Sequence, residues 1–147
     1  MATRRSGQGP WAPAVLSAVL AFAFVGVLVT IEVESRRVAA KSRASEAAAE
    51  ATVTRNARAF GDAVVATDDP TPTDERLAVV AEGTRVEVRE VRRAPDLVVT
   101  VYGSAPYGTM FGRVSVDACH RVTFHDLGAA RAGADVERLE VCPPPVS

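Results

Sequence analysis

Residues 11–31 read WAPAVLSAVLAFAFVGVLVTI, and the interpretation of the whole chain depends on this stretch. Its 21 residues include no charged side chain, and only Ser17 and Thr30 carry hydroxyl groups. At about 1.5 Å per residue, a helix of this length spans the ~30 Å hydrocarbon core of a bilayer. The sequence therefore predicts a transmembrane helix at 11–31, with the lipid bilayer as its first partner.

The composition limits the remaining choices. The chain has 147 residues and a net charge of −1, which leaves room for one modest domain beyond the span. Proteins that bind nucleic acid usually carry a basic surface, so this charge balance argues against a nucleic-acid partner. The tail at 1–10 is basic, whereas residues 68–147 hold nine basic and thirteen acidic side chains and are therefore acidic.

A basic tail followed by an apolar run is also typical of a cleaved secretory signal. Arg4 and Arg5 supply the charges here, but the run is longer than the 7–15 apolar residues of such a signal. No pair of small residues with cleavage-site spacing closely follows Ile31, because Glu-Val-Glu comes next. We therefore expect an uncleaved signal-anchor in a single-pass membrane protein.

The features that bear on orientation point in different directions. The segment after the span begins with several positive charges, namely Arg36, Arg37, Lys41 and Arg43. Counted alone, these charges favour a cytoplasmic C-terminus. That rule weakens for long translocated segments, and two cysteines in the distal part favour an oxidising exterior. We expect a cytoplasmic N-terminus and an extracytoplasmic C-terminal domain.

Four small residues recur at helical spacing within the span: Ala14, Ser17, Ala18 and Ala21. Small residues at this spacing allow two membrane helices to approach closely, which is one route to a homo-oligomer. Alanine is common throughout the chain, however, so the same spacing also arises without any such role.

Residues 32–67 are rich in alanine, glutamate and arginine, which favour helix, and they predict a helical stalk. One stripe of this helix is Ala40, Ala44, Ala47 and Ala51, and a second is Val53, Ala57, Phe60 and Val64. The stripes are out of phase, so a sustained coiled coil is not supported. We expect the last turns to pack on the distal domain through Phe60 and Val64. The proline-rich linker 68–73 ends the helix.

Residues 74–147 predict a small α+β domain with a mostly antiparallel sheet. Thr73 is a suitable N-cap for a helix that runs to Glu82 and is closed by Gly83, with a strand at 77–81 as the alternative. Alternating or β-branched residues predict strands at 84–91, 97–102, 111–117, 119–125 and 136–142. The third and fourth of these could form one long strand. Glycine and proline mark 103–108 as a loop, and 127–135 reads as a connection.

Cys119 and Cys142 each fall on a predicted strand. A domain of this size is near the limit at which a single core is sufficient, so a cross-link would help it to fold. We expect a disulfide between the two cysteines if the domain lies outside the cytoplasm. In the reverse orientation they would be ordinary buried thiols.

No pattern in the sequence predicts a metal, a cofactor or a catalytic group. Cys119, His120, His125 and Cys142 lack metal-ligand spacing. Ser115, Asp117 and His120 contain the residue types of a hydrolase triad, but strand alternation puts His120 on the opposite face. The stretch GSAPYGTMFG at 103–112 has neither the lysine nor the helix of a phosphate loop.

The same stretch offers a candidate partner surface in Tyr107, Met110 and Phe111. Exposed aromatic and methionine side chains are frequent at protein interfaces. The alternative is that these side chains, Phe111 first among them, belong to the core of the domain.

The layout, together with CHRVTF at 119–124 and VCPPP at 141–145, resembles single-pass membrane proteins of high-GC actinobacteria. This resemblance implies an anchored domain and brings no activity with it. Type IV pilin-like subunits are similar in outline, but they carry a glycine cleavage site and a glutamate in the apolar segment, and neither feature of that pattern is present. Septum-formation proteins are also similar, but their coiled coil does not match the stalk.

These observations favour a non-enzymatic, membrane-anchored interaction module whose domain binds another protein of the cell envelope. A self-assembling pilin-like or cell-division subunit is the first alternative. The second is a ligand-binding or enzymatic domain whose site is built from residues far apart in the sequence.

Overall fold

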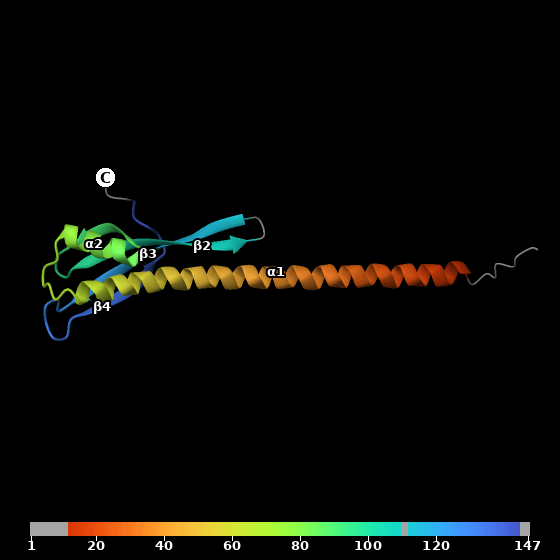
Figure 1. Cartoon of the computed structure of the whole chain (residues 1–147), viewed down its shortest axis with the longest axis horizontal. Helices are drawn as coiled ribbons and strands as arrows, with labels where there is room; N and C mark the ends of the chain where they lie inside the picture. The colour runs from red at the N-terminus through yellow and green to blue at the C-terminus, as the bar shows by residue number, and fades with distance from the viewer. Residues whose placement is uncertain (1–11, 110–111, 145–147) are drawn as a thin grey trace, which may run out of the picture. The chain divides into compact units, whose positions relative to one another are not determined.

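The computed structural model describes residues 12–109 and 112–144, with side chains from residue 22 onwards except Ala23. The chain falls into two compact units, Met1–Lys41 and Ser42–Ser147. The elements in order are α1 (Ala12–Val65), α2 (Asp74–Thr84), β1 (Glu87–Arg92), β2 (Val98–Thr109), β3 (Gly112–His125) and β4 (Gly133–Leu139) (Figure 1).

Helix α1 has 54 residues and includes most of the predicted span and stalk. Beyond Pro13 it contains no proline, and its alanine, glutamate and arginine residues favour an uninterrupted helix. Among the residues with described side chains, no helix is long and apolar enough to cross a membrane. Trp11 and the side chains of the four small residues, Ala14, Ser17, Ala18 and Ala21, lie outside the described part, so the predictions made on them stay predictions.

The second unit is an α+β domain, as predicted, in which helices cover one face of a four-stranded antiparallel sheet. The strand order β1-β2-β3-β4 follows the chain, which is the arrangement that short connections favour. Along β2 and β3, mostly apolar side chains on the covered face alternate with mostly polar ones on the open face. On the covered face, Val99, Val101, Val122 and Phe124 are fully or almost fully buried. Both helices contribute to this core, α1 through Phe60 and α2 through Leu77.

The buried face of α1 confirms the expected stripe and extends it. Phe60 and Val64 are buried, as predicted. Val53 and Ala57 of the same stripe are buried too, and the stripe extends back to Ala49, so about four helical turns pack on the sheet rather than the last turns alone. The other predicted stripe is not used within this domain, because Ala44 and Ala51 are exposed.

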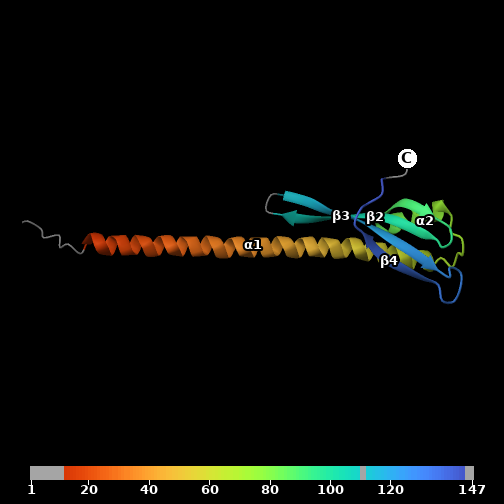
Figure 2. The same ribbon diagram turned by 180° about the vertical axis from the view of Figure 1, so that it is seen from behind.

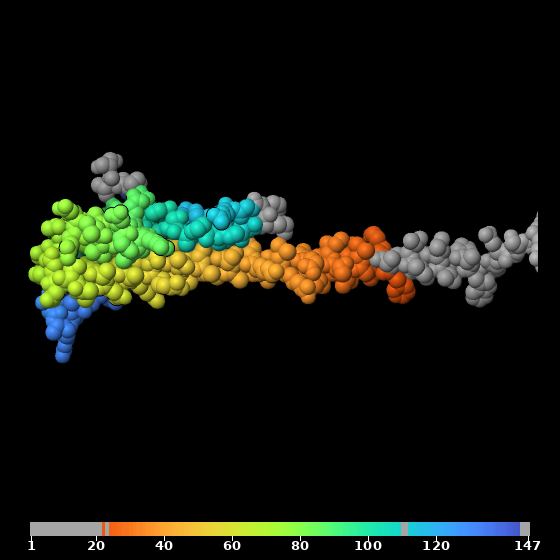
Figure 3. Space-filling model, viewed as in Figure 1, coloured from red at the N-terminus to blue at the C-terminus, as the bar shows by residue number. Residues whose placement is uncertain are grey.

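Residues 103–108 are not a loop, which corrects the prediction. They continue β2, which pairs with β3 as far as Thr109 and Gly112, and β3 is one long strand. The reason is that α1 lies against this hairpin (Figure 2), whose small residues Ala105 and Ala118 pack on Val53. In the space-filling view the side chains of the hairpin are in direct contact with those of α1 (Figure 3).

The end of α2 also differs from the prediction. Thr73 is the N-cap, as expected, and its side chain accepts a hydrogen bond from the Arg76 N–H. The helix continues past Gly83 to Thr84, and Arg85 adopts the left-handed conformation with φ of 60°. The Val86 N–H then donates to the Ala81 carbonyl, as in a Schellman motif. Burial of Val86 in the core therefore outweighs the preference for glycine at this position.

Strands β1 and β4 are displaced from their predicted bounds. Strand β1 starts at Glu87 because α2 occupies Thr84, and it carries an irregularity between Val88 and Glu90. Strand β4 runs from Gly133, three residues before the predicted start, to Leu139. Cys142 therefore follows the strand rather than lying on it.

Candidate functional site

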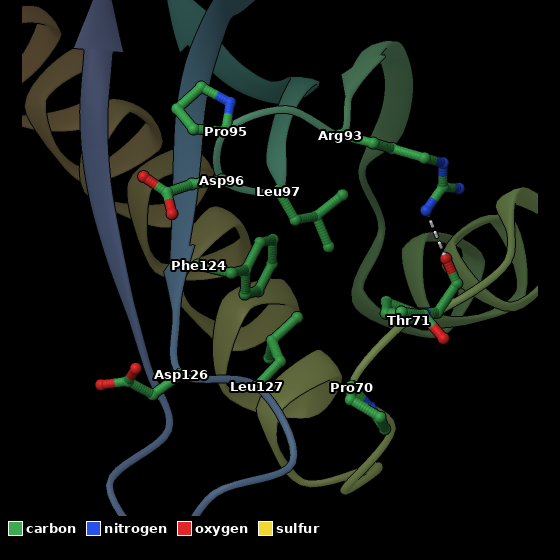
Figure 4. A pocket seen from close by; sticks show the side chains of 10 residues that line it. Pro70, Thr71, Arg93, Pro95, Asp96, Leu97, Phe124, Asp126 and Leu127 are labelled. Atoms are coloured by element: carbon green, nitrogen blue, oxygen red, sulfur yellow. Dashed lines mark hydrogen bonds between the residues drawn. The ribbon is translucent and has the colours of Figure 1, made fainter.

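A pocket of about 270 Å³ opens at the end of the domain where three loops meet. Its walls come from the α1–α2, β1–β2 and β3–β4 connections, which are distant in sequence. Leu97, Phe124 and Leu127 lie next to one another across its middle, and Pro70 and Pro95 stand at its edge (Figure 4). The apolar side chains at the centre of the pocket are therefore part of one end of the hydrophobic core.

Hydrogen bonds fix the loops that form the walls. The Arg93 Nη1 group donates to the Pro72 carbonyl at 2.8 Å, the bond drawn as a dashed line in Figure 4. The same guanidinium forms an ion pair with Asp74 at the start of α2. On the opposite wall, the Phe124 N–H donates to the Leu97 carbonyl at 2.9 Å. These bonds fix the positions of the loops around the pocket.

The β3–β4 loop depends on a glycine that follows the pocket residue Leu127. Gly128 has φ of +76°, a conformation that side chains other than glycine rarely adopt. A Cβ at this position would also lie 3.0 Å from the Pro70 side chain. Glycine therefore allows this loop to close against the linker between the helices.

The edge of the pocket carries two acidic groups without a counter-charge. Asp96 and Asp126 are exposed, and neither side chain forms a hydrogen bond or ion pair with any other residue that the structure describes. They lie on the side of Phe124 away from Arg93, whose charge is engaged by Asp74 (Figure 4). The pocket combines an apolar centre with a negative edge.

A polar network occupies the open face of the sheet. The carboxyl of Asp117 has its pKa lowered chiefly by its hydrogen bond with Ser104, and hydrogen bonds with Tyr102 and Ser115 act in the same direction. Partial burial and the neighbouring Asp117 raise the pKa of Tyr102. The guanidinium of Arg89 stands 4.6 Å above the centre of the Tyr102 ring, a cation–π contact.

The residue types of a hydrolase triad are not brought together. Ser115 and Asp117 belong to the open-face network, whereas His120 is buried and its Nε2 lies 3.2 Å from the Thr54 hydroxyl of α1. Within the described ranges, no three histidine, cysteine or acidic side chains gather into a site that could hold a metal ion.

Cys119 and Cys142 form a disulfide, as predicted, with their Cα atoms 5.3 Å apart. Cys119 is buried on the sheet, and Cys142 lies in the segment after β4. The bond therefore fastens the C-terminal segment to β3.

The predicted partner surface is described only in part. Tyr107 is half-buried and packs against the small cluster that Ala49 and Val53 of α1 form with Ala105 and Ala118 of the hairpin. Met110 and Phe111 lie outside the described residues. The use of this surface by a partner stays a prediction.

Comparison with models of protein families, with curated proteins and with solved structures finds no match for this chain.

The pocket was missed by sequence reasoning because its residues come from three separate loops. One signal could have indicated it. The dipeptide Asp-Leu occurs at 96–97, before β2, and again at 126–127, after β3. In an antiparallel pair the start of one strand lies beside the end of the next, so both dipeptides belong to the same edge of the sheet.

Proposed function

We propose that this protein is a membrane-anchored module that displays its disulfide-bonded domain outside the cytoplasmic membrane, where it binds another envelope protein without catalysing a reaction. The anchor is the stretch 11–31, and the domain begins in the second half of α1. Three features support this function: an apolar helix, a small folded domain, and a pocket with no catalytic group at its centre.

The observation that carries the proposal is a run of exposed apolar side chains on α1. The large ones that the structure describes are 43–80% exposed, namely Phe22, Phe24, Val25, Val27, Leu28, Val29, Ile31 and Val33. Because they occupy nearly successive positions, they point to all sides of the helix. Soluble proteins rarely leave so much apolar surface in water, so we assign it to the bilayer.

The disulfide supports the extracytoplasmic side. Disulfides persist in oxidising compartments and are rare in the cytosol, and the bond between Cys119 and Cys142 accounts for both cysteines of the chain. The acidic character of residues 68–147 also suits a domain held away from anionic lipid headgroups.

Two matched cysteine variants of the full chain test the anchor and its direction. Glu75→Cys places a thiol on the exposed side of α2, and Ser6→Cys places one in the basic tail. In intact cells, a membrane-impermeant maleimide should label Glu75→Cys directly and Ser6→Cys only after lysis. The opposite pattern, or recovery of the chain in the soluble fraction, would contradict the proposal.

A self-assembling subunit is the second candidate, since the same exposed apolar run could be buried against further copies of the chain. Size measurement of the full chain in mild detergent separates the two possibilities. A monomer supports the single anchored module, whereas a defined oligomer supports self-assembly.

A further inference from the structure

The pocket at the three-loop end combines features that together select one kind of ligand. Its centre is apolar, formed by Leu97, Phe124 and Leu127. Its edge carries the carboxylates of Asp96 and Asp126, which form no hydrogen bond or ion pair with any residue that the structure describes. Arg93 lines the opposite side of the pocket, and its charge is paired with Asp74. A ligand that satisfies both the centre and the acidic edge needs an apolar stem and a positive end.

We infer that this pocket receives an arginine or lysine side chain of the partner protein. Both side chains lay a hydrocarbon stem along apolar surface while the charged end stays near water. The stem would contact Leu97 and Leu127, and the guanidinium or ammonium group would be attracted by Asp96 and Asp126.

The size of the pocket suits a single side chain. Its volume of about 270 Å³ lies at the lower end of the range of about 300–1,000 Å³ that is usual for small-molecule sites. Interfaces commonly concentrate their binding energy in one anchor side chain that fills a pocket of the partner. The negative edge disfavours anions such as phosphate groups.

This inference deepens the proposed function and depends on it only for where the partner resides. Labelling of Glu75→Cys tests the side of the membrane, and the experiment below tests the pocket. If the domain is found in the cytoplasm, the preference of the pocket for cations can still hold. If the pocket test fails, the assignment of the membrane anchor still stands.

The test uses the full isotope-labelled chain in a neutral detergent and two pairs of probes. N-acetyl-arginine amide and N-acetyl-lysine amide carry the charge, and N-acetyl-citrulline amide and N-acetyl-norleucine amide are their neutral counterparts. We expect the charged probes to cause saturable shifts of the Leu97, Phe124 and Leu127 amide signals, with millimolar dissociation constants because a single side chain offers little contact. The neutral probes should bind several-fold more weakly.

Two double variants distinguish the effect of the carboxylates at the pocket edge from the effect of the net charge of the whole protein. In Asp96→Asn/Asp126→Asn, we expect the charged probes to bind about two- to fivefold more weakly for each lost carboxylate and the neutral probes to bind unchanged. Asparagine is well tolerated at Asp126, whose φ is 52°. Glu46→Gln/Glu82→Gln removes two exposed acids elsewhere and should leave all four probes unaffected.

Three results would overturn the inference. Equal affinity for arginine and citrulline amides would show that the pocket is only an apolar site. Tighter binding of norleucine amide than of lysine amide would show the same. The absence of shifts at Leu97, Phe124 and Leu127 with every probe would mean that the pocket binds no side chain. The comparison of charged with neutral probes on the unaltered chain needs no variant, so it holds even if a substitution impairs folding.

Discussion

Gly103 lies in the middle of β2, directly beneath α1. A Cβ on this residue would stand 2.8 Å from Cγ1 of Val53, closer than atoms in a packed core approach. Glycine in a strand often marks such a close approach of another element. The size of this one residue therefore sets how near the helix can come to the sheet.

Gly103→Ala is expected to lower the free energy of unfolding by roughly 1–3 kcal/mol, because the added methyl overfills the contact with Val53. Adding Val53→Ala should recover part of this loss, giving a coupling that a double-mutant cycle measures. The measurement is hydrogen exchange of the β2 and β3 amides in the full chain. As a control, Gly83→Ala meets no atom within 4 Å and should stabilise α2 by about 0.5–1 kcal/mol. Equal effects of the two alanines would contradict this account.

His120 is the buried ionisable group of the covered face. Its Nε2 contacts Thr54, and its Nδ1 is buried without a hydrogen-bond partner among the described residues. Burial is the main reason that the pKa of His120 is lowered, and the positive charges of Arg138 and Arg58 act in the same direction. Arg138 is itself paired with Glu50 of α1, so this charge remains in place beside the imidazole.

The lowered pKa makes folding sensitive to mild acid. As the pH falls, the unfolded chain binds a proton at His120 near the ordinary pKa of about 6.5, before the folded chain does. The contribution of this residue to stability is therefore complete above pH ~6.5 and is lost as the pH falls toward the folded pKa, by at most about 1.4 kcal/mol per pH unit. Unfolding curves at pH 7.5, 6.5 and 5.5 should show this loss.

Two histidine variants show which residue causes the loss of stability at low pH. His120→Leu should abolish the loss of stability that protonation of His120 causes. His125→Gln should keep it, because His125 is exposed on the other face and pairs with Asp135. An unchanged pH dependence in His120→Leu would show that another group is responsible.

At the scale of elements, the disulfide joins β3 to the segment after β4. It closes a loop with a sequence separation of 23 residues, for which the chain-entropy argument gives about 3 kcal/mol of stabilisation. Reduction should lower the midpoint of thermal unfolding of the full chain. Cys119→Ala/Cys142→Ala should unfold at a similarly low midpoint and show no response to reductant. Two free thiols in protein exported by its native host would contradict the bond.

The packing of α1 on the sheet depends most on Phe60. Its ring is fully buried and meets the ring of Phe124 edge-on, with 6.3 Å between the ring centres. Phe60→Ala should cost about 3–5 kcal/mol of unfolding free energy because it leaves a cavity under the helix. Ala51→Ser, on the exposed side of the same helix, should change stability by less than about 0.5 kcal/mol. Denaturant unfolding of the full chain compares the two, and similar losses would contradict this packing.

At the scale of the whole molecule, the proposed anchor should be sensitive to charge. Phe22 lies close to the middle of 11–31, and its side chain is 80% exposed. Phe22→Arg is expected to cost about 2.5–3.5 kcal/mol of insertion free energy and to raise the fraction of chain extracted by alkaline carbonate. Ala44→Arg adds the same charge on the same helix within the second unit and should leave extraction unchanged. Equal extraction of both variants would contradict an anchor at 11–31.

Local patterns in the sequence were enough to predict that residues 32–65 are helical, as well as the Thr73 cap, the α+β class and the stripe that includes Phe60 and Val64. These features depend on neighbours within a few residues, where spacing and capping act directly. The cysteine pair was also predictable, because only two cysteines are present and a small domain gains most from a cross-link.

Features that depend on distant residues were decided only by the tertiary structure. Residues 103–108 have a loop composition, yet they form a strand because α1 covers them and requires small side chains at Gly103 and Ala105. Arg85 rather than Gly83 ends α2 because the core takes up Val86. The pocket likewise exists only once three loops meet, because each loop supplies no more than a part of its wall.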